Sequence, residues 1–162
     1  MLHLACAENT AFTVDARETL QAQASYTVDT LSALRAEYGP QRPLCLLLGA
    51  DAFLGLNSWR RWADLFSLAH IVVAQRPGFP QATWLDTMPA DLQRMLNERG
   101  STQVERLRHN PAGQIFVFSI TALDIAATRI RKSLGEGLSP RYLLPEPVLN
   151  YIFANRLYTH DA

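Results

Sequence analysis

A short run of basic residues that follows an apolar segment carries the clearest chemical signal in this chain. Residues 114–120 are typical of a β-strand, and residues 124–131 follow them. We expect Thr128 to be the N-cap of a helix, with Arg129 and Arg131 in its first turn. Because the free N–H groups and partial positive charge of a helix N-terminus attract anions, this stretch indicates a site for a nucleotide or another phosphorylated ligand. The alternative is a surface helix with incidental arginines.

The composition fits one soluble domain over residues 1–162. The 15 basic and 15 acidic residues cancel, which argues against non-specific binding of nucleic acid. Cys6 and Cys45 lack metal-ligand spacing and lie among apolar residues, so we expect buried free thiols. No apolar run is long enough to span a membrane, and the first residues lack the features of a signal peptide. We therefore expect a cytoplasmic protein.

The pattern along the chain alternates between helical and strand signals. The expected strands are 12–15, 44–48, 70–74 and 114–120, and the expected helices are 1–8, 27–38, 59–68, 85–99, 128–134 and 145–155. This alternation predicts the α/β class, with a doubly wound parallel sheet. The continuous apolar run 44–48 suits a strand that is buried on both faces. Ser25 or Thr27 could cap the helix over 27–38, and Gly39 should end it.

Three marked segments each follow an expected strand. These are residues 49–51, 75–78 and 124–131. Because ligands of such sheets bind at the carboxyl ends of the strands, all three should face one rim. Residues 79–113 form a long excursion between strands, which could be a lid or a plain surface insertion.

The histidines form no recognisable constellation, and we predict no metal site. His70 opens an apolar strand and is interpreted as a packing or turn residue, while His3, His109 and His160 receive no role.

Several short motifs together resemble one enzyme family. They are Ser25-Tyr-Thr-Val-Asp-Thr-Leu31, Leu48-Gly-Ala-Asp-Ala-Phe53, Ser58-Trp59, Ala69-His-Ile-Val-Val73, Arg76-Pro-Gly78, Ile125-Ala-Ala-Thr-Arg-Ile-Arg131 and Leu144-Pro-Glu-Pro-Val-Leu-Asn-Tyr-Ile152. In this order and spacing the chain resembles bacterial nicotinate-nucleotide adenylyltransferases, from its first residues to about Leu157. The resemblance implies a Rossmann-like nucleotidyltransferase fold. It also implies joining of nicotinate mononucleotide to ATP with Mg²⁺, which gives deamido-NAD and pyrophosphate in NAD biosynthesis.

The resemblance assigns ATP-binding roles to five residues. Thr128 and Arg131 would hold phosphates of ATP. Gly49 would let the backbone approach the nucleotide, and Asp51 would accept hydrogen bonds from a ribose. Arg76 would lie near the adenine.

The resemblance also places the second substrate. Trp59 would stack on the pyridine ring, and Tyr26 with Thr27 would lie against the nicotinate end. The neighbours of the tryptophan, Asn57 and Arg60, are expected to be solvated.

The chain departs from the family at its most diagnostic motif. The family carries Gly-Gly-Thr-Phe-Asp-Pro and a His-x-Gly-His pair that polarises the ATP phosphates, and this sequence contains neither. The first β-α-β unit is apparently missing, which would leave a strand edge unpaired, and no catalytic residue is identified. We expect a fragment or a mis-started reading frame rather than a natural short form. A smaller departure is Ala126, where the family has serine.

Two other functions remain open. One is a related adenylyltransferase that uses nicotinamide mononucleotide or phosphopantetheine as the acceptor. The other is a non-catalytic nucleotide-binding or interaction module, which the absent histidine pair favours.

Overall fold

A computed structural model describes residues 1–75, 84, 87–121, 123 and 125–158. The chain forms two compact units. The sheet unit is Arg17–Ala122, and the helical unit combines Met1–Ala16 with Leu123–Ala162. Each unit is described by itself below, and the single domain expected over the whole chain stays a prediction.

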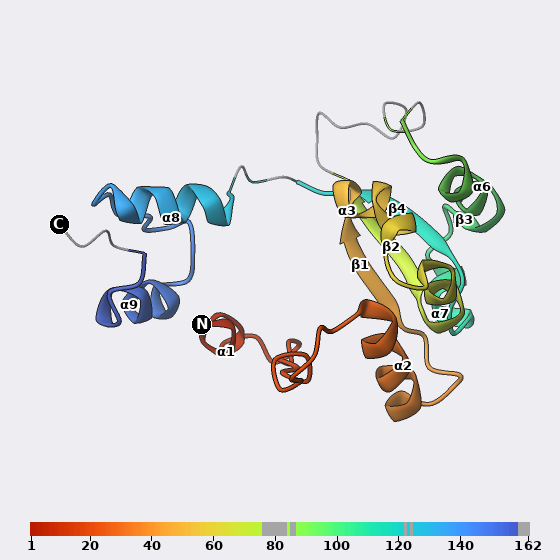
Figure 1. Cartoon of the computed structure of the whole chain (residues 1–162), viewed down its shortest axis with the longest axis horizontal. Helices are drawn as coiled ribbons and strands as arrows, with labels where there is room; N and C mark the ends of the chain where they lie inside the picture. Colours follow the sequence, from red (N-terminus) through yellow and green to blue (C-terminus); the bar gives the residue numbers. More distant parts are fainter. Residues whose placement is uncertain (76–83, 85–86, 122, 124, 159–162) are drawn as a thin grey trace. The chain divides into compact units, whose positions relative to one another are not determined.

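The sheet unit is built on four parallel strands (Figure 1). These are β1 (Cys45–Gly49), β2 (His70–Gln75), β3 (Gly100–Ser101) and β4 (Ile115–Ser119), in the order β1-β2-β4-β3. Leu47 pairs with Val72, which in turn pairs with Phe116. The parallel α/β architecture and three of the four expected strands are confirmed. The strand expected over 12–15 is wrong, because this segment has no strand partner and leaves Phe12 61% exposed.

The helices of the sheet unit connect and cover these strands. They are α2 (Thr27–Tyr38), α3 (Ala50–Leu54), α4 (Leu65–Leu68), α6 (Ala90–Arg99) and α7 (Glu105–His109), with 3₁₀ turns η1 (Leu56–Ser58) and η2 (Trp62–Asp64). The prediction of α2 is confirmed at both ends. Gly39 ends it at φ +85°, a conformation that favours glycine.

Two helices begin later than the sequence predicts. The expected helix over 59–68 is interrupted, because Trp59 is extended and Arg61 adopts the left-handed conformation at φ +52°. The expected helix over 85–99 begins at Ala90, directly after the extended Pro89. From α6 the chain runs into β3, and Leu92 and Leu96 are buried in the core. The described part of 79–113 is therefore integral to the sheet unit rather than a plain surface insertion.

The core of the sheet unit lies on one face of the sheet. Leu48, Ile71, Val73 and Ile115 point into it together with the apolar side of α2. On the opposite face Leu47 is 63% exposed. The expectation that β1 is buried on both faces is therefore wrong. The apolar run predicts a strand but cannot tell which of its side chains find neighbours.

The expectation that both cysteines are buried is wrong. Cys45 is exposed on the same strand, and Cys6 is only half-buried. Both are free thiols, as expected. Partial burial still raises the pKa of the Cys45 thiol, so it stays protonated at neutral pH.

Two polar side chains, the half-buried Arg35 and the buried His70, connect the amino ends of the strands. The Arg35 guanidinium donates to the carbonyl oxygens of Leu68, Arg42 (2.6 Å) and Pro111 (2.9 Å), which precede β2, β1 and β4 respectively. The sequence offers no signal for this role of Arg35, since its partners are distant along the chain.

His70 makes a second connection at this end of the sheet. Its side chain is fully buried. The N–H of Gln114 donates to His70 Nδ1 at 3.0 Å, so Nε2 carries the proton and donates to the Asn110 carbonyl oxygen at 2.8 Å. The interpretation of His70 as a packing residue is confirmed.

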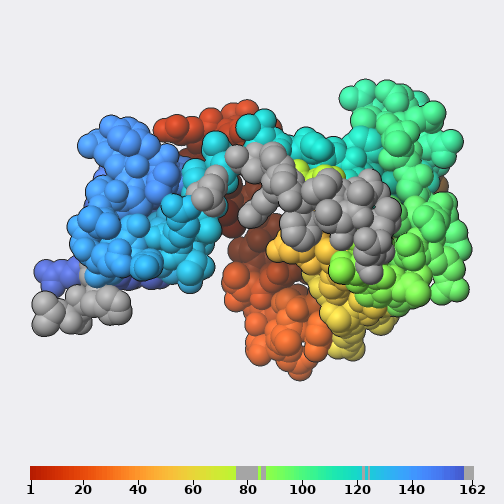
Figure 2. All heavy atoms as spheres, turned by 90° about the horizontal axis from the view of Figure 1, so that it is seen from above, coloured from red at the N-terminus to blue at the C-terminus, as the bar shows by residue number. Residues whose placement is uncertain are grey.

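The helical unit contains α1 (Leu2–Cys6), α8 (Ala127–Gly135) and α9 (Glu146–Ala154), and α8 and α9 form one blue body in Figure 2. Leu134, Val148 and Ile152 form its small core. Gly137, at φ +73°, ends α8 with paired bonds from its own N–H to Leu134 and from Leu138 N–H to Ser133. None of the helices in the described segments has the length and apolar character needed to cross a membrane.

Candidate functional site

The first helix of the sheet unit begins at a pocket that contains the three predicted substrate-binding residues. A cavity of about 250 Å³ is lined by Ser25, Tyr26, Thr27, Ser58, Trp59 and Arg60. One wall is the start of α2 and the other is the chain that leaves η1. The structure therefore brings Tyr26 and Thr27 to Trp59, although they are far apart in the sequence.

The start of α2 differs from the sequence-based expectation. Tyr26 is the N-cap in extended conformation, and no side chain makes a capping bond. The expectation that Ser25 or Thr27 caps the helix is wrong, because the Ser25 hydroxyl donates back to Glu18 and Gln21 instead. The first N–H groups of α2 are therefore left without a side-chain partner at the pocket.

The two neighbours of Trp59 are not merely solvated, as the sequence suggested. The Arg60 guanidinium lies over the Tyr26 ring, with its carbon 4.5 Å from the ring centroid, and it lines the pocket. Asn57 Nδ2 lies 3.3 Å from a carboxylate oxygen of Asp91 and ties η1 to α6. Arg60 is exposed, as expected, and its ring contact is an additional finding, whereas the half-buried Asn57 differs from the expectation. An arginine beside a tryptophan carries no local sign that its partner is a distant tyrosine.

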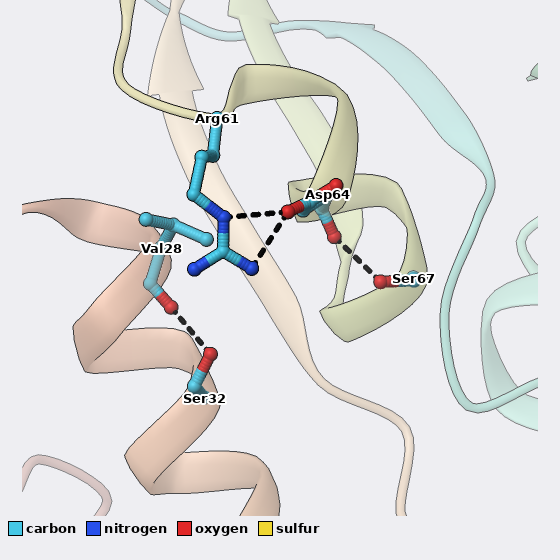
Figure 3. Close-up of polar contacts among 5 residues, drawn as sticks. All are labelled: Val28, Ser32, Arg61, Asp64 and Ser67. Carbon is cyan, nitrogen blue, oxygen red and sulfur yellow. Dashed lines mark hydrogen bonds and ion pairs between the residues drawn. The ribbon is translucent and has the colours of Figure 1, made fainter.

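The next arginine has a structural role (Figure 3). Arg61 pairs with the Asp64 carboxylate at 2.7 Å, and the Ser67 hydroxyl donates to the Asp64 carbonyl oxygen at 2.7 Å. These bonds hold η2 against the start of α4. The left-handed turn at Arg61 lies directly after Trp59 and Arg60 and precedes η2.

Gly49 and Asp51 form a second predicted group, at the carboxyl end of β1. Gly49 ends the strand and is the N-cap of α3, while Asp51 is exposed in the first turn of that helix. A Cβ on Gly49 would lie 2.6 Å from Asp51 Oδ1. The carboxylate therefore occupies the space that a side chain at position 49 would need.

Replacing Gly49 by alanine should displace the Asp51 carboxylate without unfolding the protein. Gly49 has an ordinary extended backbone, and the clashing atom is the end of a movable side chain. We expect the melting temperature to change little, while affinity for ATP falls about 5- to 10-fold through loss of about one hydrogen bond. Calorimetric titration with ATP checks this. An unchanged affinity would contradict a role for the Asp51 position.

The predicted phosphate-binding helix exists, but it begins earlier than expected. Helix α8 starts at Ala127, with Ala126 as N-cap at φ −130° and ψ 139°. Thr128 is therefore the second helical residue, and the expectation that it is the N-cap is wrong. The first turn contains no acidic residue. The Arg131 guanidinium carbon lies 5.9 Å from the Tyr158 ring centroid.

Substitution of Ala126 tests whether α8 begins at this residue. The backbone of Ala126 has N-cap geometry, but its side chain cannot accept a bond from the helix. We expect Ala126→Ser to stabilise the helical unit by about 1 kcal/mol. Thermal denaturation followed by circular dichroism measures the change, and Thr121→Ser, outside any helix, is the control. A gain for Thr128→Asn instead would place the cap at Thr128.

The remaining expectations concern residues outside these groups. Arg76 and Asp124 lie outside the described residues. Within the described part of the chain, no three histidine, cysteine, aspartate or glutamate side chains gather in a way that could hold a metal ion. Gly49 and Asp51 belong to the sheet unit, and Thr128 and Arg131 to the helical unit. Their shared role toward ATP stays a prediction.

Comparison with known proteins identifies the family. The family described as cytidylyltransferase-like matches residues 1–133. The "Probable nicotinate-nucleotide adenylyltransferase" of Dechloromonas aromatica (strain RCB) is 48% identical over 99% of this chain and 73% of its own length. The protein of the same name from Methylococcus capsulatus is 45% identical over 98% of this chain and 73% of its own length.

A solved structure agrees in fold. The Plasmodium falciparum nicotinic acid mononucleotide adenylyltransferase complexed with APC superposes with a TM-score of 0.55 at 17% identity. The match covers 85% of this chain and 60% of that structure, so the chain spans less than two thirds of its length. The chain belongs to the cytidylyltransferase-like family and, within it, to the nicotinate-nucleotide adenylyltransferases.

Proposed function

We propose that this chain serves adenylyl transfer from ATP to nicotinate mononucleotide, which gives deamido-NAD and pyrophosphate in NAD biosynthesis. The observation that carries the proposal is the pocket at the start of α2. It combines an aromatic wall, Trp59, with the polar edge of Tyr26 and Thr27. A pyridine ring that bears a carboxylate matches this combination of a flat apolar surface and hydrogen-bonding groups. The relatives named as nicotinate-nucleotide adenylyltransferases support the same substrate.

The reaction is a direct displacement. An oxygen of the 5′-phosphate of nicotinate mononucleotide attacks the α-phosphorus of ATP and forms the new P–O bond. The bond from the α-phosphorus to the bridging oxygen breaks, and pyrophosphate leaves with its electron pair. Such a reaction depends on positioning and on stabilisation of charge rather than on a covalent intermediate with the protein.

The residues of this chain divide between the two substrates. Trp59 stacks on the pyridine ring, and the exposed Asp51 accepts a hydrogen bond from a ribose beside Gly49. Helix α8 begins next to Thr128 without a side-chain cap, so its N-terminus attracts the phosphates of ATP, and Arg131 adds a guanidinium for them. Mg²⁺ enters with ATP as part of the substrate, bound mainly by phosphate oxygens and water. The cytoplasmic location expected from the sequence stays part of this proposal.

The test measures binding and turnover in one preparation of the chain. Calorimetric titration with nicotinate mononucleotide and with Mg-ATP measures binding. Chromatography with mass detection then looks for deamido-NAD, and a coupled assay looks for pyrophosphate. Both products in equal amounts would establish the proposal. Failure to bind either substrate would overturn it.

One alternative has its own support. The sequence contains no His-x-Gly-His pair, so the groups that polarise the ATP phosphates in the family are absent from this chain. Binding of both substrates without any deamido-NAD, even after addition of a segment that carries this motif, would favour a nucleotide-binding module over an enzyme. Addition of phosphopantetheine or nicotinamide mononucleotide in the same assay tests the other acceptors.

A further inference from the structure

Arg60 differs from the other residues at the pocket in its charge. Among the described residues that line the cavity, it is the only one with a charged side chain. Its guanidinium forms no ion pair with any described carboxylate, whereas that of Arg61 is paired with Asp64. Asp29, the acidic residue in the first turn of α2, does not line the cavity. A positive charge is therefore available at the pocket.

Although Arg60 is exposed, its guanidinium is restrained by contact with an aromatic ring. It lies over the Tyr26 ring at 4.5 Å, a distance at which a cation and the face of an aromatic ring attract each other. This contact restricts a long side chain that would otherwise sample many rotamers, so less conformational entropy is lost when a ligand binds. The start of α2, with its uncapped N–H groups, adds partial positive charge at the same cavity.

The two pyridine mononucleotides differ in charge at one position of the ring. Nicotinate mononucleotide carries a carboxylate on its ring, and nicotinamide mononucleotide carries a neutral carboxamide at the same position. A guanidinium offers two parallel N–H donors that match both oxygens of a carboxylate. The carboxamide presents one oxygen and an NH₂ group, which repels a second donor.

We propose that the Arg60 guanidinium selects the acid over the amide in the Trp59 pocket by pairing with the carboxylate on the pyridine ring. The inference rests on the proposed function and names one residue that determines its substrate. Trp59 binds the pyridine ring common to both mononucleotides, while the Arg60 guanidinium pairs with the carboxylate that only nicotinate mononucleotide carries.

The experiment compares the affinities of the full chain and its variants for both mononucleotides. Arg60→Gln removes the charge and keeps a donor, and Arg60→Lys keeps the charge without the planar fork. Arg42→Gln is the matched control, because the Arg42 guanidinium lies over Tyr38 at 5.0 Å, at the other end of α2. Calorimetric titration gives each dissociation constant, and circular dichroism confirms that each variant is folded.

We expect Arg60→Gln to weaken binding of nicotinate mononucleotide about tenfold, as loss of a charge-assisted hydrogen bond predicts. Binding of nicotinamide mononucleotide should change less than about twofold, since no charge is lost toward it. Arg60→Lys should recover part of the preference, and Arg42→Gln should behave like the unaltered chain.

The possible results separate the inference from the function on which it rests. An equal loss of affinity for both mononucleotides would overturn selection by Arg60 and leave it a general positioning residue. An unchanged preference in Arg60→Gln would overturn it as well, while binding to the unaltered chain would leave the proposed function intact. Absence of binding of either mononucleotide to the unaltered chain would overturn the proposed function and, with it, the inference.

Discussion

Replacing His70 by leucine is expected to lower the free energy of unfolding by about 3 kcal/mol. Leucine fills a similar volume but can neither accept the bond from Gln114 N–H nor donate to the Asn110 carbonyl oxygen. Two backbone groups that the buried imidazole satisfies would lose their partner. Both bonds are partly buried, and leaving such a polar group unpaired costs about 1–3 kcal/mol.

Urea denaturation followed by circular dichroism measures the effect, and a second histidine supplies the control. His109 is exposed at the last turn of α7, only one residue before the Asn110 that His70 binds. We expect His109→Leu to stay within about 0.5 kcal/mol of the unaltered chain. Equal stabilities for the two variants would show that the His70 bonds contribute nothing.

Replacing Trp59 by leucine is expected to weaken binding of nicotinate mononucleotide about 30-fold, with Mg-ATP binding changed less than about twofold. Stacking of a flat heteroaromatic ring on an aromatic side chain contributes about 1–3 kcal/mol. Leucine keeps an apolar surface in the cavity but removes the aromatic face. Trp59→Phe keeps a smaller ring and should lose about threefold. Quantitative calorimetric titration of each variant checks the order of affinities.

A second tryptophan separates loss of stacking from loss of packing. Trp62 lies three positions along the chain and packs edge-to-face on Phe66, with ring centroids 6.1 Å apart. Both tryptophans contact the core, but only Trp59 lines the cavity. Trp62→Leu should therefore lower the melting temperature without changing affinity for the mononucleotide. A similar loss of affinity in both variants would mean that stacking by Trp59 is not the cause.

The elements of the sheet unit were largely predictable because their signals are local. The apolar run of β1 and the periodic pattern of α2 each lie within a few residues, and Gly39 marks the end of the helix. Exposure of Leu47 was not predictable, because it depends on what packs over the strand. The two-residue β3 has no pattern of its own and exists only through pairing with β4.

The site was predictable where the family motifs carry it and not elsewhere. Tyr26, Thr27 and Trp59 follow from the resemblance, and the cavity brings them together. Arg60 was missed because its partner is a ring on another element. The start of α8 was misplaced because threonine is a better cap than alanine, whereas the backbone turns into the helix at Ala126.

Arg35 also bears on how this fold can change in evolution. Its guanidinium joins the chain just before three neighbouring strands, and His70 joins two of the same connections, all at the amino ends. These contacts lie at the opposite end of the strands from Gly49, which pairs with Ala74 at the carboxyl end of β1. Residues around the cavity can therefore be substituted during evolution to bind a different acceptor substrate without displacing the strands. A lysine at position 35 carries its three donors on a single nitrogen and has no planar fork, so it could not bond the same three separated carbonyl oxygens. The scaffold would then be less tolerant of substitutions around the cavity.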